Sequence, residues 1–420
     1  MATIYSAKYL LPIDAPPIAG GALLDLDGEI AAVGSLKQLR HEFPAADVVE
    51  YAEAVITPLL INAHTHLELT DFPVWAGKAG ETEKLNDFVD WILKLIRVKR
   101  SLGKKDYHQS IENGIRLSLA AGTGAVGDIL SQYACRKAYK KSTLQGIVYL
   151  ESLGHDPGII SKVRQELRSV LAEEQVGNLR FGLSPHSPYT ISSEYLQDIF
   201  SKCRRQGLPC STHLAESPAE VEFIQQGRGD LAEKLYPFVG WEYLVPDGSS
   251  LRPAAYLQSQ GGLFPGNLLV HGVQLVDKEI DLLKSKKMAL ALCPRSNAKL
   301  SVGKAPVQQL MRAGIKLCLG TDSLASNDSL SIWDEAAFAH SWFAGAIDAP
   351  SLLRMATRHG AEVLGVDKRL GSLEKGKDSS FQVIHIDSSV AENELYDYLV
   401  APGVTENILQ VVHQGQTMLV

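Results

Sequence analysis

The amino-acid sequence predicts an α/β fold, namely a (β/α)8 TIM barrel with a small β-sandwich domain formed by both chain termini. Through the middle of the chain, apolar runs of strand length alternate with amphipathic helical stretches, which is typical of a parallel sheet with crossover helices. Both ends instead carry short strands broken by Gly and Pro. The chain has 420 residues, 45% of them hydrophobic, and is long enough for a large barrel core and a smaller companion domain.

The small β domain is expected to take residues 1–57 and 366–420, and residues 58–365 to form the metal-dependent catalytic barrel. Short strands are predicted on both sides of the barrel, at residues 9–12, 21–24, 30–34, 381–386 and 408–412. We expect these two sets to pair as one sheet domain beside the barrel.

Eight apolar runs can be counted in the barrel region: residues 55–61, 124–129, 146–150, 179–183, 209–212, 267–270, 288–292 and 315–319. Helical stretches lie between them, for example at residues 86–100, 111–121, 159–174 and 192–206. Eight such strand–helix units fit a TIM barrel.

Two segments of this region allow more than one structural interpretation. The apolar stripe of the 86–100 helix is expected to be core rather than lid; it comprises Phe88, Trp91, Ile92, Leu95 and Ile96. The long connection at residues 237–265 is either a wall of the active site or a surface excursion.

Composition excludes some classes of function. Lys and Arg number 41 and Asp and Glu 48, so the net charge is -7, and no basic cluster indicates a nucleic-acid or anionic-membrane surface. The five cysteines show no Cys-x-x-Cys spacing, which favours free thiols in a reducing compartment. No signal-peptide pattern and no apolar stretch of about 20 residues is found, so we expect a cytoplasmic protein.

Ionisable residues follow the ends of several predicted strands. In a TIM barrel, these ends surround the active site. In the first of these groups, two histidines are spaced i and i+2, so their side chains leave the strand on the same side. The residues concerned are His64, His66, His186, His213, Glu216, His271 and Asp322.

Three imidazoles and one carboxylate suit a divalent metal ion. We expect His64, His66, His213 and Asp322 to hold one such ion, Zn²⁺ by preference and Fe²⁺ or Mn²⁺ as alternatives. The ion would lower the pKa of a bound water toward about 7 and so provide hydroxide near neutral pH.

Two further residues are expected to take part in catalysis. His271 would orient or deprotonate the water, and Glu216, three residues beyond His213, would pass a proton to a ring nitrogen of the substrate. Simpler readings remain: His271 could bind a backbone carbonyl, Glu216 could be a first-turn helix acid, and Asp322 an N-cap. His186 could be a turn residue between two prolines.

The motifs at residues 64–66, 213–216, 270–272, 293–300 and 320–323 resemble the amidohydrolase superfamily, most closely its cytosine-deaminase-like branch. Binuclear members carry a carboxylated lysine at the end of the fourth strand. The run at residues 179–184 has no lysine, so the resemblance implies a single metal ion.

Two subfamilies of nucleoside deaminases are similar to this chain. Residues 186–189, 293–300 and 322–327 resemble the adenosylhomocysteine/methylthioadenosine deaminases. The segments that resemble aminodeoxyfutalosine deaminases of menaquinone biosynthesis are residues 62–69, 211–217, 301–305 and 356–360. The resemblance implies hydrolytic removal of the 6-amino group of an adenine nucleoside, with 6-amino-6-deoxyfutalosine as the favoured substrate and ammonia as a product. Adenosylhomocysteine, methylthioadenosine or a triazine-type substrate are the alternatives.

The resemblance also implies roles for single residues. Glu216 would protonate a ring nitrogen, His271 would position the hydroxide, and Asp322 would carry its proton to the leaving amine. Substrate contacts are expected from Glu216 itself and from His186, Asn297 and Glu151. A homodimer is implied by the family alone. A non-enzymatic alternative is a metal-binding scaffold that lacks catalysis. Such a protein would be expected to lack a metal ligand or the catalytic acid, and none of these residues is missing from the sequence.

Overall fold

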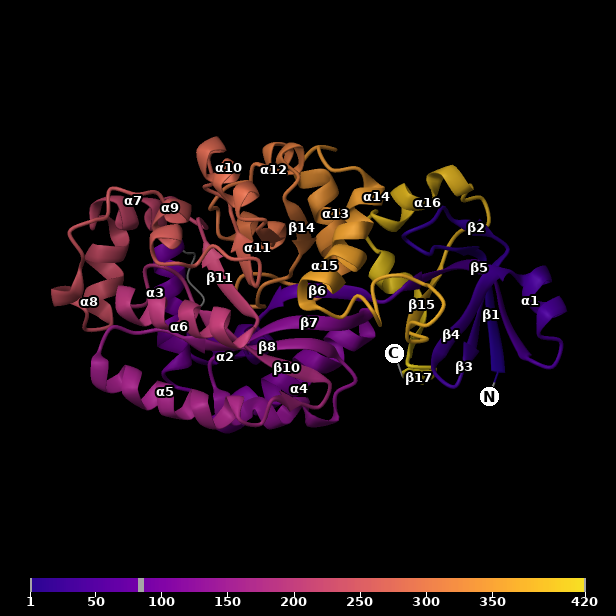
Figure 1. The fold of residues 1–420 in the computed structure, drawn as a ribbon, viewed down its shortest axis with the longest axis horizontal. Coiled ribbons are helices and arrows are strands. Elements are labelled where there is room, and N and C mark those ends of the chain that lie inside the picture. The colour runs from indigo at the N-terminus through magenta and orange to yellow at the C-terminus, as the bar shows by residue number, and fades with distance from the viewer. Residues whose placement is uncertain (1, 82–86, 419–420) are drawn as a thin grey trace.

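The structure is a computed structural model that describes residues 2–81 and 87–418. It confirms the predicted TIM barrel and a separate sheet formed by both termini. In Figure 1 the barrel occupies the left and centre, and the terminal sheet lies at the right together with both chain ends. None of the described helices is both long and apolar enough to cross a membrane.

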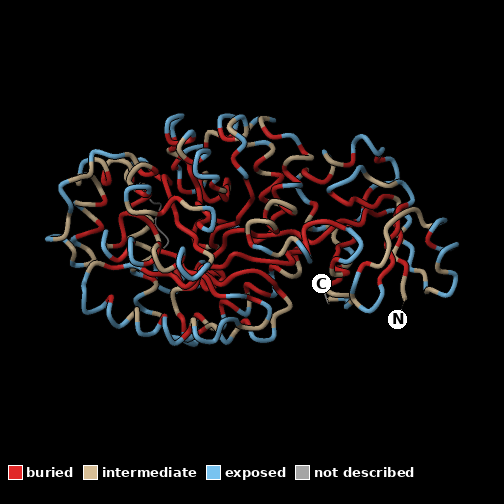
Figure 2. Tube along the Cα trace, viewed as in Figure 1, coloured by how far each residue is buried: buried red, intermediate tan, exposed pale blue. Residues whose placement is uncertain are grey.

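Eight parallel strands form the barrel in sequence order, and a short strand, β9 (Gln175–Val176), pairs with β10 outside it. The barrel strands are β6 (Leu60–Thr65), β7 (Thr123–Leu130), β8 (Gln145–Ser152), β10 (Leu179–Pro185), β11 (Cys210–Leu214), β12 (Asn267–His271), β13 (Ala289–Leu292) and β14 (Lys316–Leu319). Almost all of their residues are buried, as expected of a parallel sheet covered by helices. In Figure 2 the strands of the barrel are coloured red, as buried residues, along nearly their whole length.

Helices connect and cover the strands. Their bounds are α1 (Leu36–Glu42), α2 (Phe72–Lys78), α3 (Phe88–Lys99), α4 (Lys104–Ala120), α5 (Pro157–Leu171), α6 (Ser193–Gln206), α7 (Pro218–Gln226), α8 (Tyr236–Phe238), α9 (Pro253–Ser259), α10 (Asp277–Ser285), α11 (Pro294–Lys299), α12 (Val307–Ala313), α13 (Ile332–Trp342), α14 (Ala349–Arg354), α15 (Gly360–Leu364) and α16 (Leu395–Leu399). The start of the predicted 86–100 helix, Asn86, lies outside the described residues.

Local sequence explains where these helices begin and end. The Ser192 hydroxyl accepts a hydrogen bond from the Tyr195 backbone N–H and so caps α6, which ends at Gly207 with φ 63°. In α4, Ile111 and Ile115 are spaced by one helical turn, and both join the core that the barrel strands form.

The terminal sheet contains eight strands: β1 (Ala2–Leu10), β2 (Ile18–Ala19), β3 (Gly21–Leu26), β4 (Glu29–Ser35), β5 (Asp47–Pro58), β15 (Phe381–His385), β16 (Ile408–His413) and β17 (Gln416–Met418). Strand β5 joins the two ends of the chain, because it pairs with β1 on one side and β15 on the other. The domain limits at 57/58 and 365/366 stay a prediction; they fall beside the ends of β5 and α15.

The prediction of one strand over residues 55–61 was wrong. The structure divides this apolar run between the two sheets: β5 ends at Pro58, and β6 begins at Leu60. Proline has no backbone N–H to donate to a ladder, so Pro58 is a natural point for the chain to leave the terminal sheet. Apolar content alone did not reveal this change of sheet.

The barrel closes where the end of β14 meets β6. Thr65 forms a parallel bridge with Asp322, and the Asn62 side chain hydrogen-bonds the Thr321 hydroxyl (2.8 Å). A Cβ atom added at Gly320 would lie 2.7 Å from the His64 backbone oxygen and 2.8 Å from the His64 Cβ. Only glycine therefore allows the two strands to approach this closely.

We expect the substitution Gly320→Ala to lower the free energy of unfolding by about 1–3 kcal/mol, because the added methyl group overpacks the seam. Chemical denaturation monitored by circular dichroism measures the change. Gly77→Ala in α2 is the control, since a Cβ atom there meets nothing within 4 Å. Equal stability of the Gly320→Ala variant and the wild type would contradict this expectation, because it would show that β6 and the end of β14 can move apart without cost.

Candidate active site

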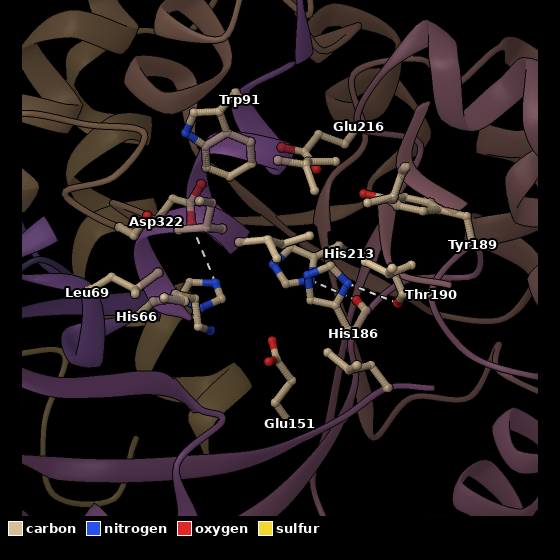
Figure 3. A pocket seen from close by; sticks show the side chains of 18 of the residues that line it. His66, Leu69, Trp91, Glu151, His186, Tyr189, Thr190, His213, Glu216 and Asp322 are labelled. Carbon is tan, nitrogen blue, oxygen red and sulfur yellow. Dashed lines mark hydrogen bonds and ion pairs between the residues drawn. The ribbon is translucent and has the colours of Figure 1, made fainter. Parts of the chain in front are cut away.

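A cavity of about 410 Å³ opens at the carboxyl ends of the barrel strands. Its wall contains His66, His213, Glu216, His271 and Asp322. The structure thus brings together side chains that are far apart in the sequence (Figure 3).

Three histidines form the base of the site. The ring nitrogens available on His64, His66 and His213 lie within 4.8 Å of one another. The ring centroids of His64 and His66 are 5.0 Å apart, and those of His64 and His213 are 4.9 Å apart. His64 lies in β6, His66 directly follows its last residue, and His213 lies in β11.

Hydrogen bonding leaves these imidazoles available as ligands. The His213 Nδ1–H donates to the His186 backbone oxygen (2.7 Å), so its Nε2 keeps a lone pair. Both ring nitrogens of His64 are buried without a hydrogen-bond partner among the described residues. Since buried polar atoms are normally paired, His64 is best explained by a ligand that its Nε2 would hold.

Asp322 faces the histidines with one carboxylate oxygen. Its Oδ1 is 3.7 Å from His64 Nε2 and 3.5 Å from His66 Nε2. Its Oδ2 accepts hydrogen bonds from the hydroxyls of Ser296 (2.7 Å) and Ser326 (2.8 Å). Burial by itself would raise the pKa of Asp322, but the neighbouring imidazoles hold it well below its ordinary value. Three imidazoles and an ionised carboxylate are a donor set that fits one divalent metal ion.

A second group adjoins the first and shares Asp322. Ligand atoms of Glu216, His271 and Asp322 lie within 4.8 Å of one another. His271 Nδ1 is 3.0 Å from Asn297 Oδ1, and its Nε2 is 3.6 Å from Glu216 Oε1. Burial lowers the pKa of His271 to about 4, so the ring is neutral near pH 7 and can accept a proton.

The surroundings of Glu216 favour its protonated form. Burial is the main cause that raises its pKa well above the ordinary value, and the charges of Asp322 and Glu220 add to the shift. The Glu220 carboxylate accepts hydrogen bonds from the backbone N–H groups of Ala215 (2.8 Å) and Glu216 (2.7 Å). It thereby supports a bend at Ala215, whose φ is 52°.

Sequence reasoning missed Glu220. The available signal was a glutamate in the first turn of the helix that follows Glu216, after the N-cap Ser217. Such a glutamate is ordinarily interpreted as a helix cap.

Some of the residues predicted to contact the substrate line the cavity, and one does not. His186 and Glu151 line the cavity. The His186 Nδ1 lies 3.0 Å from the hydroxyls of both Ser187 and Thr190. Asn297 is not among the residues that line the cavity; it lies behind His271, whose ring it hydrogen-bonds. The geometry therefore favours a positioning role for Asn297 rather than the substrate contact expected from the sequence.

The apolar stripe of α3 is part of the cavity wall, through Phe88, Trp91, Ile92, Leu95 and Ile96. The expectation that it serves only as core needs correction. The stripe packs against a separate cluster of buried hydrophobic residues, and it also faces the site. The 237–265 connection also contributes to the wall, through Val239 and Trp241.

Comparison with known proteins agrees with this arrangement. A family model described as "Amidohydrolase family" matches residues 55–418. An aminodeoxyfutalosine deaminase of Deinococcus radiodurans is 33% identical over 356 residues, which cover 82% of this chain and 81% of that protein. A 5-methylthioadenosine/S-adenosylhomocysteine deaminase of Halobacterium salinarum is 30% identical over 420 residues, covering 95% of this chain and 88% of that protein. The crystal structure of Helicobacter pylori aminofutalosine deaminase has a TM-score of 0.84 and covers 100% of both chains at 21% identity, which shows the shared fold.

We expect Ser296→Ala to weaken zinc binding by about 10- to 100-fold, because one of the two hydroxyls that orient the Asp322 carboxylate is lost. Competition with a chromogenic chelator measures the affinity. Ser285→Ala, at an exposed serine of α10, should bind zinc like the wild type. An unchanged affinity of the Ser296→Ala variant would exclude a role of this hydroxyl in metal binding.

Proposed function

Because this chain belongs to the amidohydrolase family, we propose that it is a metal-dependent hydrolytic deaminase that removes the 6-amino group of an adenine nucleoside and releases ammonia. Membership makes it a hydrolase that acts on carbon–nitrogen bonds. The observation that carries the proposal is the group formed by Glu216, His271 and Asp322 directly beside the three histidines. It combines a protonated acid, a neutral base and a candidate metal centre in one buried cavity.

His64, His66, His213 and Asp322 would hold the ion, and zinc is the metal that this ligand set fits best. When bound, such an ion acts as a Lewis acid and lowers the pKa of a water molecule. A mononuclear site is proposed, because the run at residues 179–184 has no lysine that could bridge a second ion.

The protein side chains would then move the protons. Glu216, kept protonated by burial, donates to a ring nitrogen of the purine and makes the amine-bearing carbon more electrophilic. His271, whose orientation Asn297 fixes, positions the attacking water through Nε2. Asp322 takes up the proton that the attacking water loses and passes it to the leaving amine, so that ammonia departs.

We propose 6-amino-6-deoxyfutalosine, an intermediate of menaquinone biosynthesis, as the substrate. Support comes from the Deinococcus relative and from the α3 wall, where Phe88, Trp91 and Leu95 offer aromatic and aliphatic surface to the 5′ substituent. The alternative is a methylthioadenosine/adenosylhomocysteine deaminase, which the Halobacterium relative supports. A triazine hydrolase that expels chloride would need less proton assistance than Glu216 provides.

The substrate is a free small molecule, and the predictions of a cytoplasmic location, of no membrane or nucleic-acid partner and of a possible homodimer stay predictions.

We expect the zinc-loaded protein to release ammonia from adenine nucleosides, with the highest kcat/KM on aminodeoxyfutalosine among that compound, adenosine, methylthioadenosine and adenosylhomocysteine. Glu216→Gln should lower kcat by about 100- to 10,000-fold at unchanged zinc content, because the proton donor is lost. The ultraviolet shift from adenine to hypoxanthine measures turnover.

Glu222→Gln, on the helix α7 that follows Glu216 and outside the cavity, is the matched control and should keep full activity. No ammonia from any of the four nucleosides, or a Glu216→Gln variant as active as the wild type, would refute the proposal. A preference for methylthioadenosine or adenosylhomocysteine would support the alternative substrate.

A further inference from the structure

The cavity holds a second polar group that the deamination steps do not use. It consists of Glu68, Lys99 and Glu151, of which the last two line the cavity. Figure 3 shows Glu151 across the histidine cluster from Glu216. Glu151 is therefore placed to meet a part of the substrate other than the reacting edge of the purine.

Glu68 has no capacity left for a ligand. It is buried, and its carboxylate accepts hydrogen bonds from the Ser131 backbone N–H (3.0 Å), the Gln132 backbone N–H (3.1 Å) and the Ser131 hydroxyl. Its Oε1 is also 3.5 Å from Lys99 Nζ. Glu68 therefore anchors the lysine beside the cavity.

Lys99 keeps an unused donor. Its ammonium group has three N–H donors. Within the described residues it makes one hydrogen bond, to the Ser131 hydroxyl (3.3 Å), and one ion pair, to Glu68. At least one N–H remains for a ligand in the cavity that Lys99 lines.

Glu151 keeps unused acceptors. Its side chain is buried at the cavity wall, and its carboxylate makes no hydrogen bond with the described residues. Burial raises the pKa of Glu151 to about 7, although Lys99 opposes this shift. A buried carboxylate without donors is costly, so a ligand that brings donors would be favoured there.

We propose that Lys99 and Glu151 form a sugar subsite that binds the two vicinal hydroxyl groups of the ribose, with Glu151 accepting from one hydroxyl and Lys99 donating to the oxygen of the other. A diol provides a donor and an acceptor on adjacent atoms, which matches this pair. An anionic group would meet Lys99 but also two carboxyl groups, and an apolar group would leave the Glu151 carboxylate and the remaining Lys99 N–H without a partner. The assignment rests on the proposed function and adds to it a selection for ribonucleosides over deoxyribonucleosides.

The test compares adenosine with 2′,3′-dideoxyadenosine in the zinc-loaded protein. We expect the wild type to prefer adenosine in kcat/KM by about 100-fold or more, because a site built to bind hydroxyls rejects a substrate without them. Lys99→Met and Glu151→Gln should each lower kcat/KM for adenosine by about tenfold and change that for dideoxyadenosine by no more than about twofold. Calorimetric binding of inosine and 2′,3′-dideoxyinosine gives a readout that does not need turnover.

Lys94→Met, on the same helix but away from the cavity, is the control, and thermal melting reports any loss of folding through the Lys99–Glu68 pair. Lys99→Arg, which keeps charge and donors, should retain most of the preference. Equal losses on both nucleosides, or no loss on adenosine, would overturn the subsite. If the wild type deaminates neither nucleoside but binds inosine more tightly than dideoxyinosine, the deaminase proposal fails and the subsite stands.

Discussion

The site depends on the contact between Asp322 and the His64 strand at the seam of the barrel. The Asp322 backbone N–H donates to the His64 backbone oxygen (3.1 Å), and the Thr65 hydroxyl donates to the Asp322 backbone oxygen (3.0 Å). These bonds close the sheet and, in the same place, bring the carboxylate to the imidazoles. Asp322 and His271 both take a positive φ, of 56° and 72°, which costs backbone energy that the closed barrel must supply. Closure of the barrel therefore also brings the candidate metal ligands together.

Burial explains how the site separates its protonation states. Where a cluster of imidazoles surrounds the carboxylate, as at Asp322, the pKa is lowered and the group stays charged. Where apolar walls and other acids surround it, as at Glu216, the pKa is raised and the group stays protonated. One cavity therefore favours the ionised form of one carboxyl group and the protonated form of another, which is the arrangement that acid–base catalysis at neutral pH needs.

Much of this could be predicted from the sequence, because both the barrel and its site follow from short-range patterns. Apolar strands alternating with helices indicate the fold, and residues at strand ends, such as His213 and Asp322, are brought to one face by the topology. The residues that were missed carry no sequence signal that distinguishes them from ordinary helix residues. Glu220 supports the Glu216 backbone from the next helix, and Lys99 reaches the cavity from the end of α3. The change of sheet at Pro58 was hidden inside a continuous apolar run.

The most direct test of the account is anomalous diffraction at the zinc edge from crystals of the zinc-loaded protein. We predict one peak per chain, within about 2.0–2.2 Å of nitrogen atoms of His64, His66 and His213 and of an oxygen atom of Asp322. A peak that lacks any of these four neighbours, a second peak in the cavity, or no peak at saturating zinc would contradict it.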